Sequence, residues 1–584
     1  MSGGRTASGS AFEEVRADDD PAPRLDLRLV PAALLAWIAA LAGSHLPPAG
    51  TAAVAVLLAV TAVVLVAGRR WWPGVRPWKG RRRNRKPVRR SMAAGLALAC
   101  LLGAATAAHT LTAATARSNL PVPGDDGGAL VLLLVTREAA EARTGAGGAE
   151  RWILGAELLE LAVDGSLHRP ATRILVVGGD GWSEPQPGQR IRAGGKLTQA
   201  RPGQAEAAVF TAGTRPLPAG GSLRRPDVTD GSAPGGGAGT SGDWAATMRE
   251  RYRDAATGLG GDPAGLLPGM VIGDTDGMDE GLVAAMRDTG TVHLTAVSGA
   301  NCSLILGLLI VLARSCRLGR PAAAVVALCG LAAFVWLVGP EPSVLRAAVM
   351  GAIGLLGLSS GRPGRGLGFL WLAVAVLLAC EPPLAGSPGF LLSVLATLGI
   401  ILLARPLMER APAWLPRPVA AALAVPLSAQ VFCAPVIVGL QPQFTVFSLL
   451  ANVAMAPFVA PVTVLGTLAV PALAVHEGAA TVLMGAAAVC AGAIAGIARA
   501  LAGLPQAVLP WPEGAWGMVT MAACSTGNLA VLWLVIHPDR CMRFALNCHG
   551  FVVERIEDFE AWLERRRRVF RRRMRPPRTK RLLR

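Results

Sequence analysis

The sequence predicts a polytopic α-helical membrane protein of about 12 spans that carries an external small β-barrel domain. Three observations lead to this fold class. Hydrophobic residues make up 52% of the 584 residues and charged residues only 16%, whereas soluble domains average about 25% charged residues. Repeated apolar runs approach or exceed the ~20 residues that a membrane helix needs. Between the third and fourth of these runs lie short β-type segments separated by Gly and Pro.

This composition excludes a soluble enzyme, a fibrous protein and a disordered tail protein. The ten Cys residues do not indicate a disulfide framework, because eight of them lie in or beside apolar runs and no CxxC pair occurs. We therefore expect them to fill space between helices.

The membrane part consists of twelve apolar runs, which we expect to be helical. In chain order they are 29–46, 51–68, 92–115, 294–313, 321–338, 343–358, 367–380, 389–405, 418–440, 445–474, 480–503 and 515–536. The run 445–474 contains three prolines and exceeds the ~30 Å hydrocarbon core, so it is predicted to be tilted or broken.

The β-type region contains five candidate strands, which suit a small Greek-key barrel of the OB-like kind, with another small β domain as the alternative. They are 129–136, 152–163, 172–177, 189–197 and 205–211. After the linker, Met248, Tyr252, Ala256 and Leu259 recur at helical spacing, and Asp276 is expected to cap a helix that ends at Gly290.

The chain accordingly divides into seven regions. They are a polar N-terminal segment (1–28), three transmembrane helices with a basic loop (29–115), an external OB-like domain (118–223), a Gly/Ser/Pro linker (224–242), external surface helices (243–292), a second transmembrane domain (293–537) and a basic tail (538–584).

Charge places these regions relative to the membrane. The formal net charge is +18, and the excess lies in two blocks, Arg69–Arg90 with eleven Lys/Arg and Arg565–Arg584 with twelve. The positive-inside rule then puts both termini in the cytoplasm and the β domain outside the cytoplasmic membrane. The blocks would set orientation or touch anionic lipid; contact with nucleic-acid phosphates is the alternative.

Polar residues inside apolar runs are the candidate functional residues, since lipid offers them no partner. One group, His293, Ser298, Gly299 and Asn301, begins the fourth run. Either these residues line a polar pathway, or they serve helix–helix packing and hydrogen bonding.

Three further polar residues lie in later runs. Arg346 lies near the outer start of its run, and it either joins the pathway or extends its side chain to the interface. Gln430 and Asn452 are each open to the same two interpretations, pathway or packing.

Catalytic motifs are not found. Asp274 and Asp276 are weak candidates for a divalent metal, but they do not match an EF-hand, and helix capping accounts for them. We therefore expect no metal, no cofactor and no enzymatic activity.

Gly273-Asp274 followed by Gly290-Thr-Val-His293-Leu-Thr-Ala-Val-Ser298-Gly299 resembles the signature of the ComEC-type competence proteins. Three later segments are similar to that family: Pro342-Ser-Val-Leu-Arg346-Ala, Ser387-Pro-Gly-Phe-Leu-Leu-Ser393, and Ser448-Leu-Leu-Ala-Asn452 with Pro457. The resemblance covers roughly residues 30–510. The chain has no His-x-His-x-Asp-His motif, so we expect it to lack the metallo-β-lactamase-like domain of many members.

The resemblance implies a channel that imports single-stranded DNA across the cytoplasmic membrane during transformation. It implies partners as well: single-stranded DNA, membrane lipids, a DNA receptor outside, a separate nuclease and a cytoplasmic helicase. The alternatives are a secondary transporter of a small molecule or lipid, and a family member that no longer imports DNA. A membrane nuclease is a further alternative, but it would need clustered metal ligands.

Overall fold

The computed structural model describes residues 27–71, 86–122, 128–136, 140–143, 150–163, 166–185, 188–200, 206–219, 241–295, 297, 299–339, 342–359, 366–537, 542, 546 and 553–566. The chain forms two compact units, one made of Met1–Thr397 and Ala454–Leu504, the other of Leu398–Val453 and Pro505–Arg584. Most of the predicted N-terminal segment and linker, and much of the two basic blocks, lie outside the described residues.

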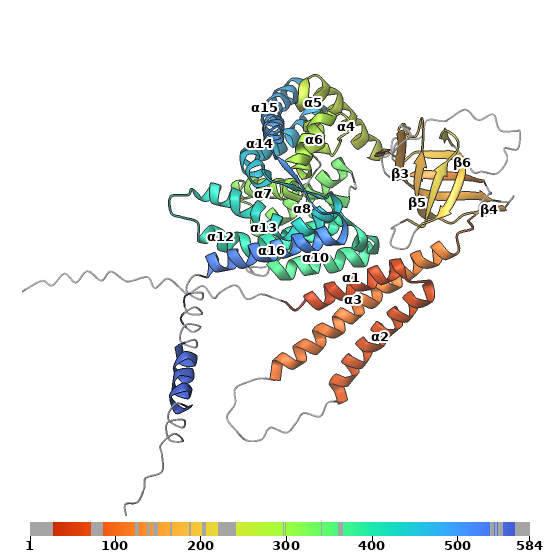
Figure 1. The fold of residues 1–584 in the computed structure, drawn as a ribbon. Helices are drawn as coiled ribbons and strands as arrows, with labels where there is room; N and C mark the ends of the chain where they lie inside the picture. The colour runs from red at the N-terminus through yellow and green to blue at the C-terminus, as the bar shows by residue number, and fades with distance from the viewer. Residues whose placement is uncertain are drawn as a thin grey trace, which may run out of the picture. The chain divides into compact units, whose positions relative to one another are not determined.

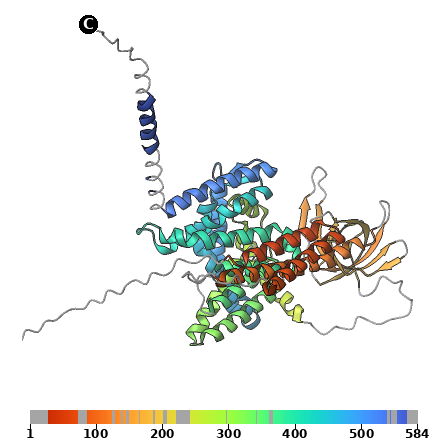
Figure 2. The same cartoon turned by 90° about the horizontal axis from the view of Figure 1, so that it is seen from below.

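The first unit begins with three apolar helices, α1 (Val30–His45), α2 (Pro48–Trp71) and α3 (Lys86–Ser118). Both views show them side by side, in red and orange (Figures 1 and 2). Small residues allow the close approach: a Cβ added to Gly43 of α1 would lie only 2.1 Å from Thr110 Oγ1 of α3. This close contact is typical of membrane helices, which associate through small residues.

The β domain is a closed barrel. Its strands are β1 (Ala129–Val135), β2 (Ala140–Arg143), β3 (Glu150–Val163), β4 (Ser166–His168), β5 (Thr172–Gly178), β6 (Arg190–Gln199), β7 (Ala208–Ala212) and β8 (Leu217–Pro218). The order β1-β3-β5-β7-β6 closes because β6 also pairs with β1, and only β5 and β7 run parallel. These five strands are the five that the sequence predicts, so the small barrel is confirmed.

Three helices and one short turn connect the barrel to the next membrane helices: α4 (Ser241–Thr257), α5 (Gly261–Ile272), α6 (Glu280–Asp288) and the 3-10 turn η1 (Val292–Leu294). The α4 stripe Met248, Tyr252 and Ala256 is buried, as its spacing predicts. The expected surface position is wrong for α5, whose residues 265–272 are all buried. The expected cap is also wrong: Asp279, not Asp276, accepts the Leu282 amide at 2.9 Å and begins α6.

The remaining helices of the first unit are α7 (Gly299–Ser315), α8 (Arg320–Val338), α9 (Pro342–Ser359), α10 (Gly366–Cys380), the short η2 (Pro382–Gly386), α11 (Pro388–Gly399), the greater part of α14 (Ser448–Val475) and α15 (Glu477–Ala502). The second unit contains η3 (Ile400–Ala404), α12 (Arg405–Glu409), α13 (Arg417–Leu440), β9 (Gln443–Thr445), β10 (Val508–Pro510) and α16 (Gly514–Ile536). Within it, α13 packs against α16 and β9 pairs with β10.

All twelve predicted runs contain a helix. Eight of the described helices are long and apolar enough to cross a membrane, and four others, of 10–17 residues, are apolar but shorter. The molecule is therefore a membrane protein, and the number of about 12 spans stays a prediction. Of the two alternatives for run 445–474, the break is wrong, because α14 is one continuous helix of 28 residues despite Pro457, Pro461 and Pro471, and the tilt stays a prediction.

Candidate functional site

The segment that leads into the second membrane domain is fixed by a tight helix end. Gly290 follows α6 with φ +68°, a left-handed conformation that favours glycine. The Thr291 amide donates to Met286 O at 2.8 Å, and the buried hydroxyls of Thr289 and Thr291 lie 2.9 Å apart. Every group that turns the chain here thus has a hydrogen bond, which gives η1 and α7 a defined starting direction.

Asn301 joins three helices of the first unit. Its side chain is 2% exposed. Nδ2 donates to Met270 O of α5 at 3.0 Å, and Oδ1 accepts from Thr463 Oγ1 of α14 at 3.2 Å. A buried amide with partners on both ends contributes to structure, because removing it would leave a buried carbonyl and hydroxyl without a partner. Asn301 therefore fixes α7 between α5 and α14.

The two other described residues of that group, His293 and Gly299, have surroundings different from those of Asn301. His293 is exposed at the 3-10 turn. Gly299 begins α7 and lies against Ala347 of α9, with an added Cβ 3.6 Å from the Ala347 Cβ. Ser298 lies outside the described residues. The neighbouring Val297 carbonyl accepts from Ser343 Oγ at 3.3 Å, so this end of α7 is tied to the start of α9.

Arg346 is the charged residue of α9 and it is buried, with 7% of the residue exposed. It does not extend to the surface, unlike an interfacial arginine. Its Nη2 lies 3.5 Å from the position that a Cβ on Gly389 would occupy, at the first turn of α11. Its Nε has no hydrogen-bond partner among the described residues. A buried guanidinium N–H without a partner is costly and calls for an explanation.

Arg346 lies near two helix N-termini and one carboxylate. It lies in the second turn of α9 and against the first turn of α11, and helix N-termini carry about half a positive charge each. Glu381 is the carboxylate that acts on Arg346 electrostatically. That carboxylate is shared, because Arg173 of β5 forms an ion pair with it at 3.4 Å. An anion near Arg346 would be met by a guanidinium and by two helix ends at once.

Gln430 and Asn452 belong to the second unit. Asn452 Nδ2 donates to Ser448 O of its own helix at 2.8 Å, and Gln430 is half-buried on α13. A side chain that bonds to its own helix backbone has an internal partner. This internal hydrogen bond is what the packing interpretation of Asn452 expects, and the choice between pathway and packing stays a prediction for both residues.

The acidic residues before α6 are engaged by arginines. Asp274 is buried and forms an ion pair with Arg253 of α4, while its Oδ1 accepts the Asp276 amide at 3.2 Å. Burial, and then the charge of Asp274, raises the pKa of Asp276. Among the described residues no three His, Cys, Asp or Glu side chains group in a way that would hold a metal ion.

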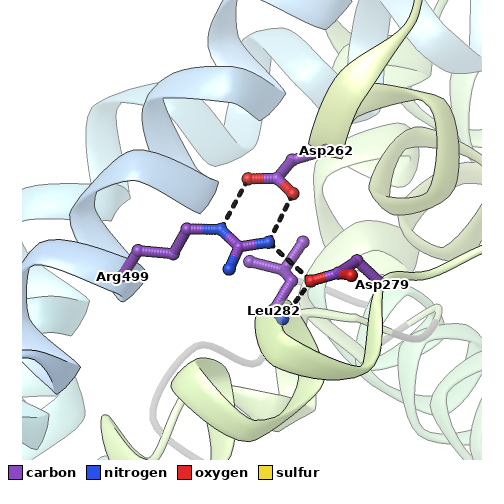
Figure 3. A network of polar contacts seen from close by, with 4 residues as sticks. All are labelled: Asp262, Asp279, Leu282 and Arg499. Atoms are coloured by element: carbon purple, nitrogen blue, oxygen red, sulfur yellow. Dashed lines mark hydrogen bonds and ion pairs between the residues drawn. The ribbon is translucent and has the colours of Figure 1, made fainter.

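A second arginine network lies on the exposed side of α15 (Figure 3). Arg499 binds Asp262 of α5 through two hydrogen bonds, at 2.8 and 2.7 Å, and reaches Asp279 of α6 at 2.7 Å. These contacts hold the pKa of both carboxyl groups below its usual range, mainly through the Arg499 hydrogen bond. One side chain thereby ties α5 and α6 to α15, and sequence spacing gives no sign of it.

A cavity of about 390 Å³ lies where α1, α3, β5 and η2 meet. Its charged and titratable lining residues are Arg117, Arg173, His109 and Glu381. Arg117 donates to the Gly43 and Ser44 carbonyls at the end of α1, at 3.2 and 3.4 Å. Sequence reasoning missed Arg173 and Glu381, because their pairing across 208 positions depends on where the barrel lies.

Two of the three barrel aromatics are not available for stacking. Trp182 and Phe210 are 1% and 0% exposed, whereas Trp152 packs against the same core but is only partly buried. The Trp182 ring N–H donates to Thr214 O at 3.0 Å, inside the domain. Single-strand binding surfaces on OB-folds use exposed aromatic rings, so Trp182 and Phe210 serve the barrel's own stability.

Comparison with known proteins places the second membrane domain in a family. The family model described as competence protein matches residues 270–536. Over these residues the chain is similar to the competence protein family. Over 197 residues the chain is 28% identical to the ComE operon protein 3 of Bacillus subtilis (strain 168), a match that covers 34% of this chain and 25% of that protein. The resemblance to the ComEC-type competence proteins is confirmed. No solved structure matches.

All of the motifs that carry the resemblance lie within this competence domain. The Gly273-to-Gly299 segment, Arg346, Gly389 and Asn452 fall between residues 270 and 536. The barrel and helices α1–α3 lie outside the matched range.

Proposed function

We propose that this protein is a channel that imports single-stranded DNA across the cytoplasmic membrane during natural transformation. The competence domain and the apolar helices support the class of protein. The observation that carries the proposal is Arg346: a buried cation at the start of two apolar helices, whose Nε has no hydrogen-bond partner in the part of the chain that the structure describes. Such a site suits an anionic group, and each phosphate of a DNA strand is one.

The proposed mechanism gives Arg346 the role of a transient phosphate contact. A guanidinium offers planar, paired donors to phosphate oxygens, and the helix ends at Arg346 favour the same charge. Glu381 remains close, so the net attraction is moderate. Moderate attraction suits conduction, because a phosphate must leave the site for the next one to enter. In this mechanism Asn301 and Gly299 position the helices and do not touch the strand.

The proposal includes orientation and partners. Both termini face the cytoplasm, and the barrel and α4–α6 face outward. The strand arrives from an external receptor, a separate nuclease removes the second strand, and a cytoplasmic helicase acts on the incoming one. The basic tail meets anionic lipid, and the chain itself has no catalytic role and no cofactor.

Uptake of end-labelled DNA into a nuclease-protected cytoplasmic pool tests this function. The strains compared are wild type, a clean deletion, Arg346→Ala, Arg346→Lys and the control Arg320→Ala, an exposed arginine at the start of α8, all at matched membrane levels.

The expected result is loss of internal DNA in the deletion and in Arg346→Ala, partial uptake in Arg346→Lys, and normal uptake in the control, with surface binding intact throughout. Normal uptake in the deletion would overturn the function and favour a small-molecule transporter. Loss in the deletion but not in Arg346→Ala would keep the channel and remove Arg346 from its path.

A further inference from the structure

Two tryptophans of the first unit form a stacked pair on its surface. Trp244 of α4 and Trp336 of α8 have ring centroids 5.2 Å apart and planes inclined by only 4°. Each residue is nevertheless 45% exposed. Because the rings cover one another's inner faces, the exposed area belongs to their outer faces and edges. Exposed aromatic faces of this kind can bind another ring or apolar group.

The pair is held firmly. Met248, Tyr252 and Ala256 anchor α4 through its buried stripe, with exposures of 4%, 0% and 0%. Arg249 Nη1 donates to Val338 O, at the end of α8, at 3.2 Å. Both helices are therefore fixed beside the pair, so stacking another ring on it would cost little additional conformational entropy.

Positive charge accompanies the rings. Arg251 is exposed and lies seven residues after Trp244, which places it on nearly the same side of α4 and about 10 Å along the helix. Glu250 lies about 120° away around the same helix. A flexible strand that stacks a base on the tryptophans can therefore bring a phosphate to Arg251.

We infer that Trp244 and Trp336 form a stacking platform for the bases of a single DNA strand, with Arg251 meeting the backbone. The identity of the strand rests on the proposed function. Stacking suits import because every base has a π-face, so the platform would accept any sequence. Counted from the proposed cytoplasmic N-terminus, the fifth predicted span (321–338) ends outside the membrane, so Trp336 lies at the end of α8 where the strand would arrive. Trp182 and Phe210 of the barrel are buried and do not provide such a surface.

Binding of labelled oligo-dT and of an abasic sugar-phosphate oligomer of equal length separates stacking from charge. The full chain is held in lipid nanodiscs as wild type, Trp244→Ala, Trp336→Ala, the double variant and the double Phe variant. Trp414→Ala is the matched control, since Trp414 is 80% exposed and belongs to the second unit.

The expected loss of oligo-dT affinity is on the order of tenfold per ring replaced by Ala. Affinity for the abasic oligomer should stay unchanged, the Phe variants should retain most binding, and Trp414→Ala should have no effect. Equal binding of the two oligomers by the wild-type chain would overturn the inference, as would an equal loss of both in the double Ala variant. Unchanged binding in that variant would assign the pair to the lipid interface, where tryptophans also gather.

The same double Ala variant separates this inference from the proposed function in cells. If uptake is lost in the deletion strain but the double Ala variant binds oligo-dT as wild type does, the stacking platform is refuted and the proposed channel is retained. If deletion of the chain leaves uptake intact, the channel is wrong whatever the tryptophans bind.

Discussion

Replacing Arg346 by methionine should separate its cost to the fold from its use in transport. A buried ion pair replaced by apolar side chains of similar volume is often neutral or stabilising by about 1–4 kcal/mol, whereas loss of one partner of a structural pair costs about 3–5 kcal/mol. Glu381 would not be left alone, because Arg173 binds it and its side chain is 34% exposed. The positive helix ends around Arg346 also disfavour the cation. We therefore expect the free energy of unfolding of Arg346→Met to lie within about 1 kcal/mol of the wild-type value, or above it.

The assay is the thermal unfolding midpoint of the purified chain in detergent, measured beside DNA uptake in cells. The expected combination is an unchanged or higher midpoint with lost uptake. Glu381→Gln is the reciprocal variant and should lower the midpoint, because both Arg346 and Arg173 lose their carboxylate. The reasoning would be refuted if the unfolding midpoint of Arg346→Met were as low as that of a variant with a destabilised core. Arg346 would then be a structural residue.

Two further predictions concern the fold around the competence domain. Gly269→Ala should lower the unfolding midpoint, because the new Cβ would lie 2.4 Å from a backbone carbonyl oxygen and overpacking costs about 1–3 kcal/mol. The control Gly496→Ala should leave the midpoint unchanged, because no atom lies within 4 Å of the added Cβ. Equal effects of the two substitutions would contradict this prediction. Arg499 lowers the folded-state pKa of Asp262 and Asp279, so the stability they add is present above their unfolded pKa of about 4 and is lost as the pH falls through the folded values. The midpoint of wild type should therefore fall in acid more than that of Arg499→Gln, and parallel pH profiles would exclude the network.

Most of the architecture follows from local pattern in the sequence. Apolar runs of membrane length must become helices because lipid offers no partner to the backbone, and all twelve runs contain a helix. The five barrel strands follow from short β-type runs separated by Gly and Pro. Helix ends are harder to predict than helices. Asp276 and Asp279 are both plausible caps in the sequence, and only the folded backbone shows that Asp279 is the residue that caps α6.

The candidate site depends on contacts that sequence spacing does not encode. Arg346 lies beside Gly389 of α11 and is affected by the charge of Glu381 only because of how the chain folds between α9 and α11. Asn301 has the polarity of a pathway residue, yet its two partners make it a packing residue. The long apolar run 445–474 predicts a tilted or broken helix; α14 accommodates its three prolines without a break, and its tilt stays a prediction.

Photocrosslinking of DNA stalled in transit tests most directly whether the strand passes through this chain. Transforming DNA carrying 4-thiothymidine and a bulky group at one end is allowed to enter cells, irradiated, and the attached peptides of this chain are mapped. The account predicts adducts in the peptides that contain Arg346 and Gly389, which disappear when uptake is blocked. The lipid-facing part of α15 around Val489, 75% exposed, should carry none. An absence of adducts on this chain, with the strand nevertheless reaching the cytoplasm, would contradict the central claim.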